Sequence, residues 1–83
     1  MIAMINHNGN MARFSVDHDI ALEKVDYRIY CQGRTIHFSD FTMAARAYKR
    51  LVRVIEEGCN ALDVVKRLVS AAEMFGLKVE GVA

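Results

Sequence analysis

The chain has 83 residues, of which 53% are hydrophobic and only 8% aromatic, and its 11 basic and 10 acidic side chains leave a formal net charge of +1. This length predicts a single domain over residues 1–83, and a domain of this size buries only about 60% of its unfolded surface. The small net charge gives no global attraction to DNA or anionic lipid, so any cationic patch has to be local. The aliphatic content exceeds what one small core readily hides, which favours a homo-oligomer or a permanent protein partner.

Cysteine usage and hydropathy both indicate a cytoplasmic protein that does not enter the membrane. Cys31 and Cys59 lie far apart without CxxC spacing, and one disulfide is a poor framework for a secreted domain of this size. No apolar run reaches the roughly 18 residues that a membrane helix needs. The apolar start over residues 1–5 is too short for a signal peptide and lacks a charged n-region. We therefore expect reduced thiols and a cytoplasmic location.

The first half of the chain predicts two β-hairpins. Residues 1–6 are apolar, the following Asn8-Gly9 pair is a strong turn signal, and residues 12–16 alternate between apolar and polar. A disordered start is the competing interpretation of this region. The segment 17–24 is ambiguous, because its aspartates suit either a single capped helical turn or an ordered loop between hairpins.

The second hairpin has the cleaner pattern. Residues 25–32 alternate strictly, a turn follows at Gly33, and the chain returns as a strand over residues 35–38. The apolar residues of the return strand match the apolar face of the first strand in either register. That face carries Val25, Tyr27, Ile29 and Cys31.

An amphipathic helix is predicted from Asp40 to Glu57. Ser39 or Asp40 is suited to cap its first turn, and Gly58 ends it because glycine adopts the left-handed conformation without steric cost. One side has the three- and four-residue spacing of a core-facing helix, and consists of Phe41, Ala44, Ala45, Tyr48, Leu51, Val52 and Ile55. The opposite side is the basic stripe, which consists of Arg46, Lys49, Arg50 and Arg53.

A second helix is predicted over residues 61–75, with Asn60 as N-cap and Gly76 just after its end. The short connection demands that the two helices form an antiparallel αα-hairpin. The apolar arc of this helix covers about half of its circumference, which is wider than one sheet or one helix needs. We therefore expect part of the arc to lie in a self-association or partner interface, formed by Leu62, Val65 and Val69.

Together these elements predict an α+β fold. It consists of an antiparallel sheet of three or four strands, arranged as two hairpins, followed by an antiparallel αα-hairpin packed on one face. Residues 77–79 alternate and predict a short edge strand. A helix-turn-helix DNA-binding motif fits poorly, because the helix after the turn begins with apolar residues instead of polar, base-reading ones.

We find no catalytic, metal or cofactor motif in the sequence. The three histidines and the aspartates near them match no metal-ligand spacing, and His37 is better explained by a surface polar cluster with Arg28 and Tyr30. Cys31 falls on an apolar face, where a thiol without an adjacent base is inert. Cys59 precedes a helix, but no histidine or lysine is close enough in sequence to activate it. We predict no enzymatic activity, no metal and no cofactor.

The expected function is binding to another macromolecule. The basic stripe is a solvated helix face, a docking surface for an acidic protein partner, or a phosphate-binding surface, and the lack of interleaved aromatic residues makes nucleic acid the weakest of these. The leading hypothesis is a small non-enzymatic protein-binding module that acts as an adaptor or inhibitor. The alternative is a small nucleic-acid-binding regulator that uses the basic face of the helix over residues 40–57. Phage-encoded inhibitors, including anti-CRISPR proteins, have this general size and lack of motifs, an analogy of type that no residue carries.

Overall fold

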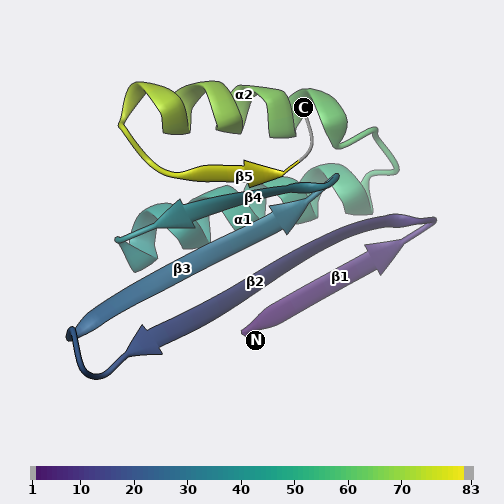
Figure 1. Cartoon of the computed structure of the whole chain (residues 1–83). Coiled ribbons are helices and arrows are strands. Elements are labelled where there is room, and N and C mark those ends of the chain that lie inside the picture. The colour runs from purple at the N-terminus through teal and green to yellow at the C-terminus, as the bar shows by residue number, and fades with distance from the viewer. Residues whose placement is uncertain (1, 82–83) are drawn as a thin grey trace.

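A computed structural model describes residues 2–81 as a five-stranded antiparallel sheet with two helices packed against one face (Figure 1). The strands are β1 (Ala3–His7), β2 (Asn10–Asp19), β3 (Lys24–Cys31), β4 (Arg34–Phe38) and β5 (Val79–Gly81), and the helices are α1 (Phe41–Glu56) and α2 (Leu62–Met74). The strands lie across the sheet in chain order. The predicted α+β fold is confirmed, and the sheet has one strand more than the three or four expected.

The turns of the β1–β2 and β3–β4 hairpins occur where the chain can adopt positive φ. Asn8 and Gly9 have φ angles of 50° and 82°, and Gln32 and Gly33 have φ angles of 53° and 77°. Two-residue hairpin turns of type I′ require positive φ at both positions, and glycine at the second removes most of the cost. β1 pairs with β2 over its whole length, so the competing expectation of a disordered start is wrong for this strand. Met1 lies outside the described residues, as do residues 82–83.

The ambiguous segment 17–24 is divided between two strands and a tight turn. β2 continues through Asp19 and β3 begins at Lys24, so that only residues 20–23 form the turn. The Asp19 carboxylate accepts a hydrogen bond from the Leu22 backbone N–H at 3.2 Å. A side-chain carboxylate in this position replaces a backbone partner and fixes the turn.

The far end of the β2–β3 hairpin is a ribbon of only two strands. β1 pairs with β2 only as far as Phe14, and β4 pairs with β3 only as far as Tyr27. Beyond these residues β2 and β3 pair with each other alone and project past the rest of the sheet, at the lower left of Figure 1. The molecule is accordingly elongated, with extents of 41 × 25 × 22 Å.

α1 faces the core with a stripe that differs slightly from the predicted one. The Asp40 carboxylate accepts a hydrogen bond from the Thr42 backbone N–H at 3.1 Å, which identifies Asp40 as the N-cap. Ala47 was not in the predicted stripe but is only 7% exposed, whereas Phe41 was included and is 50% exposed. The reason is that α1 packs against both the sheet and α2, so its buried side is turned toward the second helix.

α2 buries more of its apolar arc inside the chain than expected. Its N-cap residue is Ala61, one residue after the predicted Asn60, but the Asn60 side-chain oxygen still accepts a hydrogen bond from the Leu62 backbone N–H at 2.9 Å. Val65 and Val69 are 3% and 8% exposed and belong to the protein's own core. This corrects the expectation that they face a partner, while Leu62, at 39% exposed, stays at the surface. Whether the chain self-associates remains a prediction.

β5 widens the sheet surface on which the apolar arc of α2 packs. It pairs with β4 as an edge strand, close to the predicted residues 77–79, and α2 packs over β4 and β5 together. The sheet under α2 is therefore wider than the sequence indicated. Within residues 2–81, neither helix is long and apolar enough to cross a membrane.

Candidate functional site

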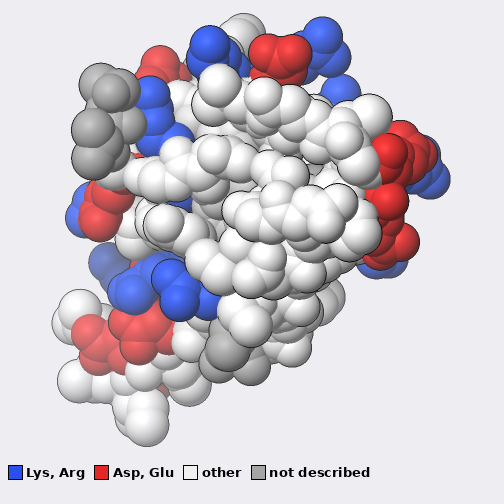
Figure 2. Space-filling view, turned by 90° about the vertical axis from the view of Figure 1, so that its right-hand side faces the viewer, with Lys and Arg blue, Asp and Glu red and all other residues white. Residues whose placement is uncertain are grey.

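The chemistry-bearing side chains gather on two surfaces, the open face of the sheet and the outer side of the helix pair. Figure 2 shows a third side of the molecule, the one at the right of Figure 1, where the β1–β2 turn and the α1–α2 connection lie. A broad uncharged surface fills its middle, and charged residues appear mainly at its margins. Its middle therefore offers no charges with which to select a partner.

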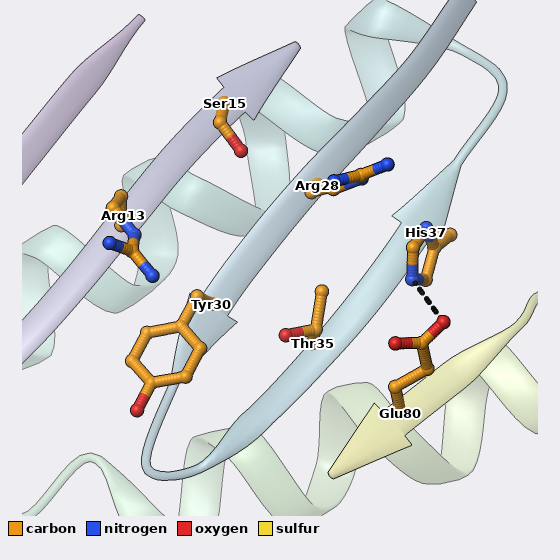
Figure 3. A pocket seen from close by; sticks show the side chains of 7 residues that line it. All are labelled: Arg13, Ser15, Arg28, Tyr30, Thr35, His37 and Glu80. Atoms are coloured by element: carbon orange, nitrogen blue, oxygen red, sulfur yellow. Dashed lines mark ion pairs between the residues drawn. The ribbon is translucent and has the colours of Figure 1, made fainter. Parts of the chain in front are cut away.

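The open face of the sheet carries a shallow basin of about 430 Å³, drawn in Figure 3. The period-two alternation of strands places its residues opposite the core, and the register sets Arg13 beside Tyr30 and Arg28 beside His37. The short side chains of Ser15 and Thr35 leave room between these larger neighbours. The seven lining residues form the open-face basin and are Arg13, Ser15, Arg28, Tyr30, Thr35, His37 and Glu80.

The Asp26 carboxylate lies beside the basin and contacts two of the basin's basic residues, Arg28 and His37. Its Oδ2 accepts a hydrogen bond from Arg28 Nε at 2.8 Å and lies 2.8 Å from His37 Nδ1. Burial by itself raises the pKa of Asp26, but the hydrogen bonds to Arg28 and His37 outweigh it and hold the pKa below its ordinary value. A second carboxylate, that of Asp17, accepts from Arg28 Nη2 at 3.0 Å. The sequence expectation of a polar cluster around His37 and Arg28 agrees with these contacts.

The other side of the His37 ring is less completely paired. Its Nε2 lies 3.3 Å from Glu80 Oε1, which is within ion-pair distance, yet this buried nitrogen has no hydrogen bond to any described residue. Lys78 Nζ lies 2.9 Å from the same Glu80 oxygen, and this hydrogen bond lowers the pKa of Glu80. Arg13 places its guanidinium 4.9 Å from the centre of the Tyr30 ring. Most charges of the basin are thus compensated inside the protein, and their clearest role is to join β2, β3, β4 and β5.

The outer side of the helix pair is different, because the arginines that line it form no ion pair with any residue between 2 and 81. A groove of about 310 Å³ runs between α1 and α2, with Phe38 and Leu77 among its lining residues. Met43 and Phe75 line it too and are 39% and 71% exposed. Arg46 and Arg50 complete the lining, which is otherwise apolar. We name this feature the helix-side groove.

The basic stripe continues from this groove along α1. Lys49 and Arg53 join Arg46 and Arg50 around an adjacent hollow of about 350 Å³. All four side chains are exposed, and none of them forms an ion pair with a residue between 2 and 81. The structure therefore brings the four predicted partner-binding residues together on one surface and shows that two of them also line the groove.

Neither surface presents an activated nucleophile or a metal-ligand cluster in the described part of the chain. No group of three or more His, Cys, Asp or Glu residues is arranged to hold a metal ion there. Burial raises the pKa of the Cys31 thiol to about 11, which keeps it protonated near neutral pH. Cys59 is exposed and unbridged. The predictions of no enzymatic activity and no cofactor stay predictions.

Sequence reasoning missed the apolar part of the groove and half of the basin. Met43 and Phe75 come from separate helices, so only the packing of the helix pair brings them to one groove. Arg13 could have been placed in the basin from the alternation of its strand, but Glu80 could not, because β5 pairs with a strand far away in sequence.

Comparisons with known proteins identify no relative. No protein-family model matches the chain, and searches of curated proteins and of solved structures found no match. The functional argument accordingly rests on the two surfaces described above.

Proposed function

We propose that this protein is a non-enzymatic protein-binding module, an adaptor or inhibitor, whose helix-side groove binds an acidic, apolar segment of another protein. The observation that carries the proposal is the combination of exposed Met43 and Phe75 with unpaired Arg46 and Arg50 around one groove. An exposed apolar patch with a polar rim is typical of a protein interaction site on a small domain. By contrast, most charges of the open-face basin already have ion-pair partners among the described residues.

The two halves of the groove have different roles in binding. An apolar side chain of the partner would cover Met43 and Phe75, and each Å² of apolar surface so buried contributes about 25 cal/mol. Arginine suits the rim because its planar guanidinium donates two parallel hydrogen bonds to a carboxylate. Lys49 and Arg53 lie farther along the stripe and act mainly on the association rate of an acidic partner.

Two synthetic peptides test the proposal directly. Both carry the same leucine and phenylalanine residues, and one has glutamates where the other has lysines. The glutamate peptide should bind the purified protein, and the paired variant Arg46→Glu, Arg50→Glu should weaken this binding at least about tenfold, or about 1.4 kcal/mol. The control variant Lys66→Glu, Arg67→Glu makes the same charge change on the exposed side of α2. Equal binding of both peptides, or equal loss in the control, refutes the proposed site.

A nucleic-acid-binding regulator is the second candidate, and the unpaired cations of the basic stripe favour it. Contacts to phosphates release counterions, so log K against log salt would have a slope of about −0.9 per contact on duplex DNA. Tight, salt-sensitive binding of the wild-type protein to DNA, lost in the Arg50→Glu, Arg53→Glu variant, would select this candidate over the first.

A further inference from the structure

We propose that the acidic, apolar segment bound by the helix-side groove is the β2–β3 turn of a second copy of this chain. This inference rests on the proposed function of the groove and names its partner. It draws on a feature that the groove itself does not use, the chemistry of residues 19–23 at the end of the projecting ribbon.

The turn presents apolar side chains with acidic neighbours. Ile20 and Leu22 are 79% and 64% exposed, among the most exposed large hydrophobic residues of the described chain. Asp19 and Glu23 flank them and form no ion pair with any described residue. The Asp19 carboxylate also holds the turn by its hydrogen bond to the Leu22 N–H, so the apolar tip is displayed on a defined backbone. We name residues 19–23 the tip.

Tip and groove are complementary in charge and in polarity. The tip offers two aliphatic side chains between two carboxylates, and the groove offers Met43 and Phe75 beside Arg46 and Arg50. Such an arrangement pairs apolar with apolar and opposite charges with each other, which favours one orientation of the complex and disfavours others.

A chain cannot insert its tip into its own groove. The tip lies at the end of the ribbon that projects beyond the other strands, whereas the groove lies between α1 and α2. Figure 1 shows the tip at the lower left and the C-terminal end of α2 at the upper left, at opposite ends of this side of the molecule. The contact must therefore be made between molecules. A reciprocal contact closes as a symmetric dimer, whereas a one-way contact extends as a ring or filament.

The size of the tip sets the expected strength of the contact. A turn of five residues covers less than the roughly 800 Å² per partner that stable complexes bury. A free two-stranded ribbon is also only marginally stable, and part of the binding energy is spent in ordering it. We therefore expect association with a dissociation constant of about 0.1–1 mM from the tip contact alone.

Analytical ultracentrifugation of two defective variants tests the contact. The tip variant Leu22→Lys, Glu23→Lys keeps Asp19 and its hydrogen bond, and the groove variant is Arg46→Glu, Arg50→Glu. The wild-type protein should associate as its concentration approaches about 1 mM, and each variant alone should remain monomeric. An equimolar mixture should recover association, but only as a 1:1 pair, because it contains one intact tip and one intact groove per pair.

Two controls exclude misfolding and a general effect of charge reversal as causes of lost association. Each variant must retain the wild-type circular dichroism spectrum, and the Lys66→Glu, Arg67→Glu variant must associate like the wild type. A wild-type protein that is monomeric throughout, a mixture that stays monomeric, or a tip variant that still associates overturns the inference. If the glutamate peptide nevertheless binds the groove, the proposed function stands and only the second copy is excluded as its partner.

Discussion

At the scale of single residues, Asp26 is the side chain on which the open face depends most. It contacts Arg28 on its own strand and His37 on β4, each at 2.8 Å, and its side chain is 33% exposed. A partly exposed ion pair contributes at most about 1 kcal/mol because solvent screens it. The value of Asp26 to the fold is therefore modest, but it has a definite pH dependence.

The stability of the protein should fall in acid partly because of Asp26. The pKa of this carboxyl is lowered below 3.8 in the folded protein. Between the lowered folded pKa and the unfolded pKa near 3.8, the unfolded chain binds more protons, so stability rises with pH in this range. The contribution of Asp26 is nearly complete above about pH 5 and is lost as the pH falls through the folded pKa. Urea unfolding between about pH 2.5 and pH 6 measures it.

The matched variant is Asp26→Asn, which keeps the size of the side chain and removes its charge. It should be less stable than the wild type at pH 6, and the difference should narrow as the pH falls. A constant difference over the whole range would show that the ionised carboxylate adds nothing to the fold and that only its shape matters.

At the scale of elements, the sequence patterns predicted the helices and strands whose pairing depends on residues close together in the chain. Alternation and turn residues were sufficient for the β3–β4 hairpin, and the short link between the helices was sufficient for their antiparallel packing. β5 has only three residues, too few for a clear period, and its partner β4 precedes it by two helices. Val65 and Val69 are buried inside the chain because α2 packs against α1 as well as over β4 and β5. The groove escaped prediction for the same reason, since its apolar and basic residues meet only after the helices pack.

The attachment of β5 should depend on the absence of a side chain at Gly81. This residue has a φ of 128°, and a Cβ atom built on it would collide with the carbonyl oxygen of Gly33 and crowd the Cα of Arg34. Gly81→Ala should therefore displace the end of β5 from β4. The 2.9 Å hydrogen bond from the His37 N–H to the Lys78 carbonyl should open more often as a result.

The hydrogen-exchange rate of the His37 backbone amide measures this displacement. It should speed up in Gly81→Ala, while amides in the centre of β3 keep their wild-type protection. Gly9→Ala is the control, because Gly9 also has a positive φ, of 82°, but a Cβ atom built on it would meet no atom within 4 Å. If the His37 amide exchanges equally fast in both variants, the close approach of Gly81 to Gly33 is not what holds the strand.

At the scale of the whole molecule, a nearly neutral protein carries separate patches of opposite sign. The net charge of +1 conceals a basic stripe along α1 and an acidic tip at the end of the ribbon. The side shown in Figure 2 is largely uncharged in its middle, and most charges of the basin are paired internally. The helix-side groove is thus where exposed apolar surface meets positive charge that has no ion-pair partner among the described residues.

An NMR titration of the ¹⁵N-labelled protein with the glutamate peptide tests whether the helix-side groove is the binding surface. The amide signals that move should be those of Met43, Arg46, Arg50 and Phe75, and the shifts should shrink as salt is raised because the arginines lie at the surface. Signals of Arg13 and Thr35 on the open face should stay in place. Shifts confined to the open-face basin, or no shifts at millimolar peptide, would contradict the account.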